Sequence, residues 1–277
     1  MIASEFEYFA PTEMTEALDL LHTKGDGARP LAGGMTLVPL MRLGMRHPAI
    51  VVSLNYVAGL DQVKDVGPAL SIGAMCRHDA VARDPLVLCH APLLALAAAS
   101  IRDVRVRKRG TLGGSIAHAD PAADCPVALV ASGATMILRS VGGERRVPAA
   151  EFFVDVMTTV LDAGELVVAV EIPKLTGLGF AHERLRRIDG EFPLVLASLQ
   201  LLPDGNGRIA LGGVGVKPVA FEFASGFADA ASVSVLGRRA FEAAVDAVGD
   251  ADGSREYRRT MARVLSERAL LTACSGR

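Results

Sequence analysis

Two double-glycine motifs constrain the fold and function of this chain more than any other feature of its sequence. The first is Ala32-Gly33-Gly34-Met35-Thr36, followed by apolar residues that could start a helix. The second lies within the stretch 109–124 and places Gly113-Gly114 directly before Ser115. Adjacent glycines can adopt backbone angles closed to other residues, so consecutive N–H groups can point into one concavity, a nest that binds phosphate. Two nests about 80 residues apart would hold a diphosphate from both sides.

Polar side chains around the second motif extend this prediction from phosphate to nucleotide. Thr111 and Ser115 carry hydroxyls that can donate to the same anion. Asp120 and Asp124 are acceptors suited to ribose hydroxyls. Each Gly-Gly taken alone is more often an ordinary turn, because short motifs frequently match by chance. The two motifs together favour a nucleotide-binding site.

The familiar nucleotide fingerprints do not fit this chain. In the stretch 25–30, GDGARP, a proline stands where the dinucleotide-binding pattern G-x-G-x-x-G needs its last glycine. The P-loop pattern G-x-x-x-x-G-K-[ST] does not occur. The sequence therefore argues against a Rossmann fold and against a P-loop fold.

The order of the two motifs resembles a known family. A-G-G-x-[ST]-L-x-P near residue 30, followed by R-x-x-G-T-x-G-G-[SN]-x-A-x-[AG]-D-P-x-x-D near residue 110, is similar to the FAD-binding (medium) subunit of molybdenum hydroxylases. This family includes the medium chains of aerobic carbon monoxide dehydrogenase and of xanthine-dehydrogenase-like enzymes. The similarity continues through residues 183–192 and ends with Glu256-Tyr257-Arg258 and Arg268-Ala269, so it covers nearly the whole chain.

The resemblance implies an α+β fold, in which a two-part FAD-binding domain of the PCMH or vanillyl-alcohol-oxidase type precedes a C-terminal domain. Apolar periodicity predicts elements in a compatible order. We expect FAD-binding subdomain 1 at residues 1–55, FAD-binding subdomain 2 at residues 56–176 and the C-terminal domain at residues 177–277. The C-terminal domain should contain a three-stranded antiparallel sheet with helices, and the turn Asp204-Gly205-Asn206-Gly207 should join two of its strands.

Three segments carry local expectations. Residues 85–100 have helical periodicity throughout. The basic run between Arg102 and Arg109 alternates with valines and could be a solvated strand face, a phosphate contact or a subunit contact. Residues 218–235 match no predicted element.

The resemblance also implies a set of cofactor contacts. The first motif would meet the diphosphate and the ribityl chain, and the second would close the other side. Asp124 would bind a sugar hydroxyl, Ile101 would lie against the isoalloxazine ring, and Arg184 stands where related chains often have lysine. Phe192 stands where carbon monoxide dehydrogenase flavoproteins have a tyrosine over the ring, and it keeps the stacking surface without the hydroxyl. The implied FAD-binding residues are Ala32, Gly33, Gly34, Met35, Thr36, Leu37, Ile101, Thr111, Gly113, Gly114, Ser115, Asp120, Asp124, Arg184 and Phe192.

No catalytic residue and no metal ligand is assigned to this chain. His118 with Asp120 and Asp124 gives no known ligand spacing for a metal. His78 and His182 are expected to be structural or surface residues. The four cysteines are widely scattered without a C-x-x-C pair, which argues against a zinc site, a disulfide framework or an iron–sulfur cluster in this chain.

The function implied by the resemblance is an electron relay. FAD in this chain would take electrons from 2Fe–2S clusters of a small subunit and pass them to NAD, a quinone or oxygen. A large subunit would bind molybdopterin, and the assembly would be a dimer of heterotrimers. Two other hypotheses stay open: a stand-alone FAD-dependent oxidase, dehydrogenase or monooxygenase on the same fold, and a scaffold that has lost the flavin.

Composition excludes some partners. The net charge of −2 and a pI of about 6.3 show no electrostatic footprint for nucleic acid. The first residues lack the charged start and apolar run of a signal peptide. The longest apolar stretch, residues 127–138, is too short to span a bilayer. We therefore expect a cytoplasmic protein without a membrane span.

Overall fold

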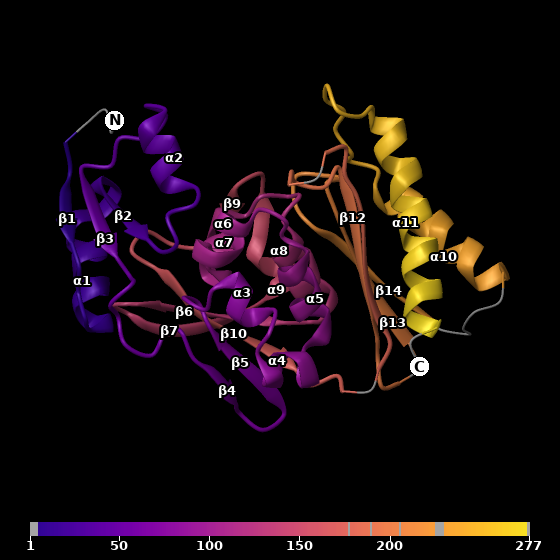
Figure 1. The fold of residues 1–277 in the computed structure, drawn as a ribbon, viewed down its shortest axis with the longest axis horizontal. Helices are drawn as coiled ribbons and strands as arrows, with labels where there is room; N and C mark the ends of the chain where they lie inside the picture. The colour runs from indigo at the N-terminus through magenta and orange to yellow at the C-terminus, as the bar shows by residue number, and fades with distance from the viewer. Residues whose placement is uncertain (1–4, 177, 189, 205, 225–229, 276–277) are drawn as a thin grey trace.

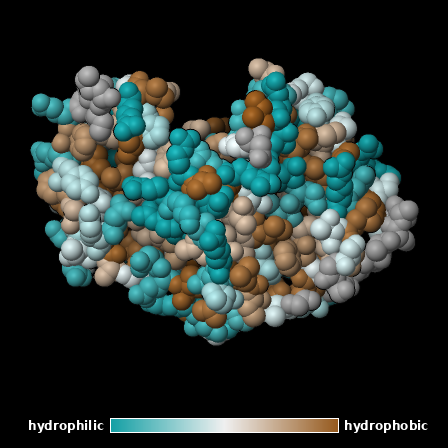
Figure 2. Space-filling model, in the orientation of Figure 1, coloured by the Kyte–Doolittle hydropathy of each residue, from teal (hydrophilic) through white to brown (hydrophobic). Residues whose placement is uncertain are grey.

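Three larger β-sheets follow one another along the chain, and helices pack against each of them (Figure 1). The structure is a computed structural model that describes residues 5–176, 178–188, 190–204, 206–224 and 230–275. In Figure 1 the N-terminal sheet and the C-terminal helices lie at opposite ends of the molecule, with the second sheet between them. Figure 2 shows the surface hollowed between these two ends, above the central part.

The N-terminal sheet is parallel and has the strand order β1-β3-β2. Helix α1 packs on it through Ala17, Leu18 and Leu21, which are buried with Ile50 and Val52. The bounds of the elements are β1 Glu7–Phe9, α1 Met14–Lys24, the 3₁₀ turn Gly25–Gly27, β2 Ala28–Leu31, α2 Leu37–Arg42 and β3 Ile50–Ser53.

The central sheet is antiparallel, with the strand order β4-β5-β10-β6-β7. Its core is made of helices packed on the sheet around fully buried side chains such as Phe152 and Leu94. A short hairpin, β8–β9, precedes strand β10. The bounds are β4 Val63–Asp65, β5 Ala69–Gly73, α3 His78–Val81, α4 Pro85–His90, α5 Pro92–Ser100, α6 Val104–Arg109, α7 Leu112–His118, α8 Asp124–Ala131, β6 Thr135–Ser140, β7 Gly143–Pro148, α9 Ala149–Phe152, β8 Phe153–Asp155, β9 Thr158–Thr159 and β10 Leu166–Pro173.

Two local predictions for this region need correction. The helical region 85–100 is two helices, because Pro92 forces the preceding residue Ala91 out of helical geometry, at φ −136° and ψ 51°. The basic run is not a strand: residues 104–109 form helix α6. Its N-cap is Asp103, whose carboxylate accepts hydrogen bonds from the amides of Arg105 and Val106.

The C-terminal sheet has four antiparallel strands in the order β11-β12-β13-β14, so the prediction of three strands is wrong. The fourth strand lies in the segment 218–235 that sequence analysis left unassigned, and residues 225–229 lie outside the described part of the chain. In the predicted turn, Asp204 accepts a hydrogen bond from the Asn206 amide, while Gly205 lies outside the described residues. The bounds are β11 Phe180–Leu185, β12 Val195–Leu201, β13 Asn206–Gly212, β14 Val219–Ala224, α10 Ala230–Ala243 and α11 Arg255–Ser275.

The C-terminal sheet is covered on both faces. Helices α10 and α11 share one apolar core with side chains such as Ala181 and Leu199. On the other face, Leu196 and Ala210 belong to the central core, where α8 contacts β12 and β13. The α+β class and the C-terminal antiparallel sheet with helices are thus confirmed. We propose domain limits near residues 55 and 176, because β3 ends at Ser53 and β10 at Pro173.

No helix in the described part of the chain is both long enough and apolar enough to cross a membrane.

Phe152 tests how far stability depends on the central core. Its side chain is fully buried and meets Phe153 edge to face, with ring centroids 5.2 Å apart. We expect Phe152→Ala to lower the free energy of unfolding by about 3–5 kcal/mol, because it leaves a cavity. Phe192→Ala, at a side chain that is 58% exposed, should change it by no more than about 0.5 kcal/mol. Urea unfolding followed by circular dichroism measures both, and equal midpoints would contradict the packing described.

Candidate functional site

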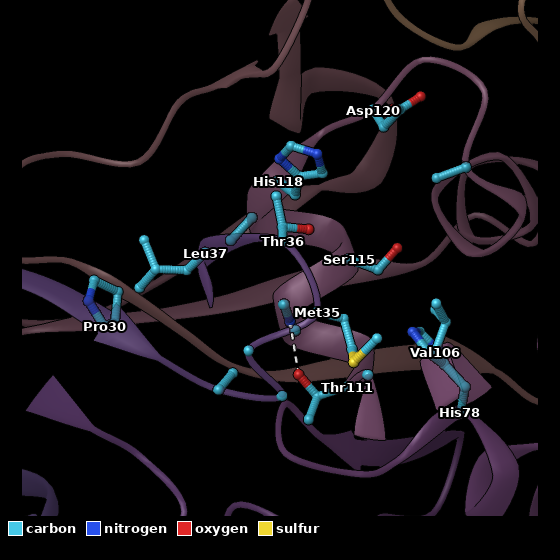
Figure 3. A pocket seen from close by; sticks show the side chains of 18 of the residues that line it. Pro30, Met35, Thr36, Leu37, His78, Val106, Thr111, Ser115, His118 and Asp120 are labelled. Carbon is cyan, nitrogen blue, oxygen red and sulfur yellow. Dashed lines mark hydrogen bonds between the residues drawn. The ribbon is translucent and has the colours of Figure 1, made fainter. Parts of the chain in front are cut away.

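A cavity of about 650 Å³ lies where the N-terminal unit, the central unit and the C-terminal strands meet. All fifteen residues predicted from the sequence line it, from the first motif to Phe192. In the close view, Met35 and Thr36 from the first motif face Thr111, Ser115 and His118 from the second (Figure 3). The structure therefore brings together residues that are up to 160 positions apart in the sequence.

The two glycine motifs touch through their backbones. A Cβ atom on Gly33 would lie 2.2 Å from the carbonyl oxygen of Arg109 and 2.8 Å from Cα of Gly110. Only glycine permits this approach, since real Cβ atoms do not come so close to backbone atoms. Gly33 is therefore required to bring the first motif against the second.

The first motif offers open amides, as predicted. Gly34 has a φ of +71°, the left-handed conformation that glycine adopts at little cost. In the described part of the chain, the amides of Gly33, Gly34, Met35 and Thr36 donate to no protein acceptor. Consecutive amides without acceptors next to a left-handed glycine are the ingredients of an anion-binding nest.

The second motif is not a nest, and this part of the prediction is wrong. Gly113 and Gly114 lie in the first turn of α7, and neither has a positive φ. The amides of Leu112, Gly113 and Gly114 already donate to Cys76 O, Ala74 O and Thr111 Oγ1. Glycine is needed here for space instead: a Cβ on Gly113 would lie 2.5 Å from the Ala74 Cβ, and one on Gly114 would lie 2.8 Å from Thr111 Oγ1.

A pair of side chains holds the two motifs in register. Asn55 Nδ2 donates to the carbonyl of Ala32 at 3.0 Å, and Asn55 Oδ1 accepts from Arg77 Nη2 at 2.7 Å. Arg77 Nη1 in turn donates to the carbonyl of Arg109. The pair links the end of strand β2 to the start of the second motif, and we call it the Asn55–Arg77 clamp.

Asp124 is the centre of a buried polar network at the C-terminal side of the cavity. Its Oδ1 accepts from His182 Nε2 and from Arg184 Nη1, both at 2.9 Å. Arg184 Nη1 also donates to the carbonyl of Ser100 at 2.7 Å. Burial raises the pKa of the Asp124 carboxyl, but the hydrogen bonds and the electrostatic attraction from His182 and Arg184 outweigh burial and hold the pKa below its ordinary value. Asp124 is therefore ionised at neutral pH. Both bonds use Oδ1, so in the described part of the chain Oδ2 is open to a ligand.

His78 lines the cavity as a neutral side chain. It is 3% exposed, and its Nδ1 lies 3.7 Å from Cys125 Sγ. Burial lowers the pKa of His78 to about 4, although Asp124 opposes this shift. The expectation that His78 is structural or on the surface misses its place in the cavity wall.

The ring-contact candidates lie at the same end of the cavity as Arg184. Ile101 follows helix α5, is partly buried against the central core, and its carbonyl accepts a hydrogen bond from Arg107 Nη1 at 2.7 Å. Phe192 is 58% exposed, so its ring is available to a ligand. Asp120 uses Oδ1 to accept from the Ala122 amide at 2.9 Å, which shapes the loop before α8.

Sequence reasoning missed Asn55, Arg77, His182 and Ser198. Nothing in the sequence pairs Asn55 with Arg77, which lies 22 positions further along the chain. His182 lies two residues before Arg184, a predicted site residue, and alternate residues of a strand share a face, so the spacing is a signal that could have found it. Ser198 is its cross-strand partner in β12, a register that the sequence does not give.

A cavity with two glycine motifs, open amides and a paired aspartate on its wall has the features of a nucleotide-binding site. The family model described as the FAD binding domain in molybdopterin dehydrogenase matches residues 4–175. The chain belongs to this family of FAD-binding subunits of molybdopterin-dependent dehydrogenases.

Named relatives and solved structures match most or nearly all of the chain. The carbon monoxide dehydrogenase medium chain of Hydrogenophaga pseudoflava is 34% identical, in an alignment that covers 99% of this chain and 98% of the relative. The glyceraldehyde dehydrogenase medium chain of Sulfolobus acidocaldarius is 37% identical over 79% of each chain. Among solved structures, carbon monoxide dehydrogenase from H. pseudoflava matches with a TM-score of 0.93 at 32% identity, covering 99% of each chain. Quinoline 2-oxidoreductase from Pseudomonas putida matches with a TM-score of 0.90 at 33% identity, covering 100% of this chain and 99% of the matched chain.

Removal of the Asn55–Arg77 clamp should weaken FAD binding even though neither side chain is a predicted cofactor contact. Asn55→Ala removes the donor to Ala32 and the acceptor for Arg77, so the two motifs are held together less firmly. We expect FAD to bind about tenfold more weakly, the effect of one or two modest hydrogen bonds. Titration of the flavin-free protein with FAD, followed by flavin fluorescence, measures the change. Asn206→Ala, in the distant β12–β13 turn, is the control, and equal affinities for the two variants would contradict the role of the clamp.

His78 predicts an acid-sensitive fold. An unfolded histidine has a pKa near 6.5, whereas folding lowers the pKa of His78 to about 4, so between these values only the unfolded chain binds the proton. Stability from His78 is therefore complete above about pH 6.5 and is lost as the pH falls towards 4. We expect the free energy of unfolding to drop by about 2 kcal/mol between pH 7 and pH 5 through this group.

Urea unfolding of the flavin-free protein at the two pH values measures this drop. His78→Gln should abolish most of it, while His22→Gln, at an exposed position on α1, should leave it intact. The same pH dependence in both variants would show that His78 does not carry the effect.

Proposed function

We propose that this chain is the FAD-carrying electron-transfer subunit of a molybdenum hydroxylase complex in the cytoplasm. It takes electrons from 2Fe–2S clusters of a small partner subunit and passes them to NAD, a quinone or oxygen. In this proposal a large subunit holds molybdopterin, and the three chains form a dimer of heterotrimers. The observation that carries it is the backbone contact between two glycine motifs at the cavity wall, in a chain whose relatives are named as medium chains of dehydrogenases.

The residues at the first motif fit the diphosphate of FAD. The open amides of residues 33–36 supply donors for an anion, and Ser115 adds a partly buried hydroxyl on the opposite wall. Gly114 leaves the space between these walls free, because a Cβ there would point at Thr111 Oγ1 and Ala32. The second motif thus contributes shape and a hydroxyl, while the first contributes the amides.

The other end of the cavity fits the sugar chain and the ring. Asp124 Oδ2 and Asp120 are acceptors for hydroxyl groups. Ile101 and Phe192 offer apolar surface for an aromatic ring, and Arg184 places a positive charge beside Ser100. FAD supplies the chemistry of the relay, since it can accept electrons singly and release them as a pair.

The composition of the native particle tests this function. The protein is purified from its source through a tag on this chain, and its FAD, iron and molybdenum contents are measured together with its subunits. We expect the particle to contain FAD, iron and molybdenum, and two other subunits besides this chain. FAD alone on a particle built only from this chain would support a stand-alone flavoenzyme instead, and a colourless particle that FAD does not reconstitute would support a scaffold.

Gly114→Val tests the residue assignment separately. Its branched side chain would fill the space between Thr111 and Ala32, so we expect the purified complex to contain almost no FAD. Gly142→Val is the matched control, because a Cβ at Gly142 meets only Ser140 Oγ at 3.5 Å in the β6–β7 turn. Undiminished flavin in the Gly114 variant, measured by absorbance after denaturation, would overturn the assignment.

A further inference from the structure

A continuous hydrogen-bonded chain runs from the inside of the C-terminal sheet to the cavity. Ser198 on β12 is fully buried, and its Oγ lies 2.8 Å from His182 Nδ1 on the neighbouring strand β11. The side chain of His182 is 0% exposed, and its Nε2 lies 2.9 Å from Asp124 Oδ1. Asp124 lines the cavity, but His182 does not. Only Asp124 therefore separates the buried imidazole of His182 from the cavity proposed to hold the flavin.

The partners of His182 suit both of its charge states. The neutral ring can donate from Nε2 to Asp124 and accept at Nδ1 from the Ser198 hydroxyl. The protonated ring donates from both nitrogens, and the hydroxyl can rotate to become the acceptor. Both ring nitrogens therefore keep a hydrogen-bonded partner when a proton is added or removed.

The charge of His182 reaches the cavity through one oxygen atom. Asp124 Oδ1 accepts from His182 and from Arg184, and Arg184 also holds the carbonyl of Ser100, next to Ile101. With a neutral imidazole, the charges of Asp124 and Arg184 cancel. With a protonated imidazole, the three groups carry one positive charge at the ring end of the cavity.

The other groups around His182 do not compete for this proton. Burial raises the pKa of the Cys125 thiol on α8 and lowers that of His78 to about 4, so both are neutral at physiological pH. Helix α5, which also packs on β11, contains no ionisable side chain. Glu183 accepts a hydrogen bond from Thr272 of α11, on the opposite face of the strand. Asp124 and Arg184 are thus the charged groups that face the imidazole in the described part of the chain.

We propose that His182 is a redox-linked proton site, which takes up one proton when the bound flavin is reduced and releases it on reoxidation. The inference rests on the proposed function, because it needs FAD in the cavity. Two electrons arrive from the reduced iron–sulfur clusters of the partner, one proton from water joins the ring, and a second proton from water joins His182 Nδ1. The extra negative charge on the ring favours the cationic imidazole. Both electrons leave for the acceptor on reoxidation, and both protons return to water.

The test is the pH dependence of the flavin reduction potential in the purified, flavin-loaded complex. Each proton taken up with two electrons lowers the potential by about 30 mV per tenfold fall in proton concentration. Wherever His182 takes up its proton together with the two electrons, the slope for the native protein should be about twice that for His182→Gln. Glutamine can still donate to Asp124 but takes up no proton. If His182 had a purely structural role, the native protein and His182→Gln would therefore show the same slope.

Ser198→Ala keeps the inference testable if the glutamine variant does not fold. The alanine removes the acceptor for the cationic ring, so the steep part of the native curve should move to lower pH. A native curve with no steep part, or parallel curves for the native protein and His182→Gln, would overturn the proton site while FAD remains bound. Absence of bound FAD would instead contradict the proposed function, so the two failures are distinguishable.

Discussion

The contact between Gly33 and the backbone of Arg109 and Gly110 is the constraint on which the site depends. The first motif belongs to a parallel sheet and the second to helices on an antiparallel sheet, so neither wall of the cavity is complete alone. Because the contact is between backbones, a side chain on Gly33 would push the walls apart. The Asn55–Arg77 clamp crosses the same junction with hydrogen bonds. Close packing and directional bonds thus act on the same gap, which fixes the distance between the open amides and Ser115.

The opposite end of the cavity depends on a different interaction, the sharing of one Asp124 oxygen between His182 and Arg184. A buried carboxylate beside a ring that gains negative charge would be unfavourable without compensation. Arg184 provides this compensation permanently, and the imidazole can add to it. Both hydrogen-bond partners of Asp124 come from strand β11, so the C-terminal sheet contributes to the electrostatics of the site, in addition to covering it.

The residues of the site could be predicted from the sequence more fully than their roles. The family resemblance carried by the two motifs implies fifteen contact residues, and all of them line the cavity. Only the glycines among them follow from the need for close backbone approach. Gly113 illustrates the limit. Its presence suggested an anion nest, whereas the structure uses it to let α7 approach Ala74, and the same residue type serves both purposes. The clamp and the His182–Ser198 pair could not be predicted, because they depend on strand register and on contacts between units. The fourth C-terminal strand was left unassigned although its sequence carries a signal: Val219, Phe221 and Phe223 alternate with less buried residues, which is the period of a strand.

The basic run before the second motif shows how charge can act through position. Arg107 Nε and Lys108 Nζ reach Asp79 on α3, at 3.2 and 2.6 Å, so their charges are largely used within the central unit. Arg107 also donates to the carbonyl of Ile101. A single arginine therefore connects α3 to the residue proposed to face the flavin ring. The charged hydrogen bond from Arg107 to the buried Asp79 carboxylate is strong, so it holds the arginine in place. Arg107 in turn fixes Ile101 at the cavity wall through its carbonyl.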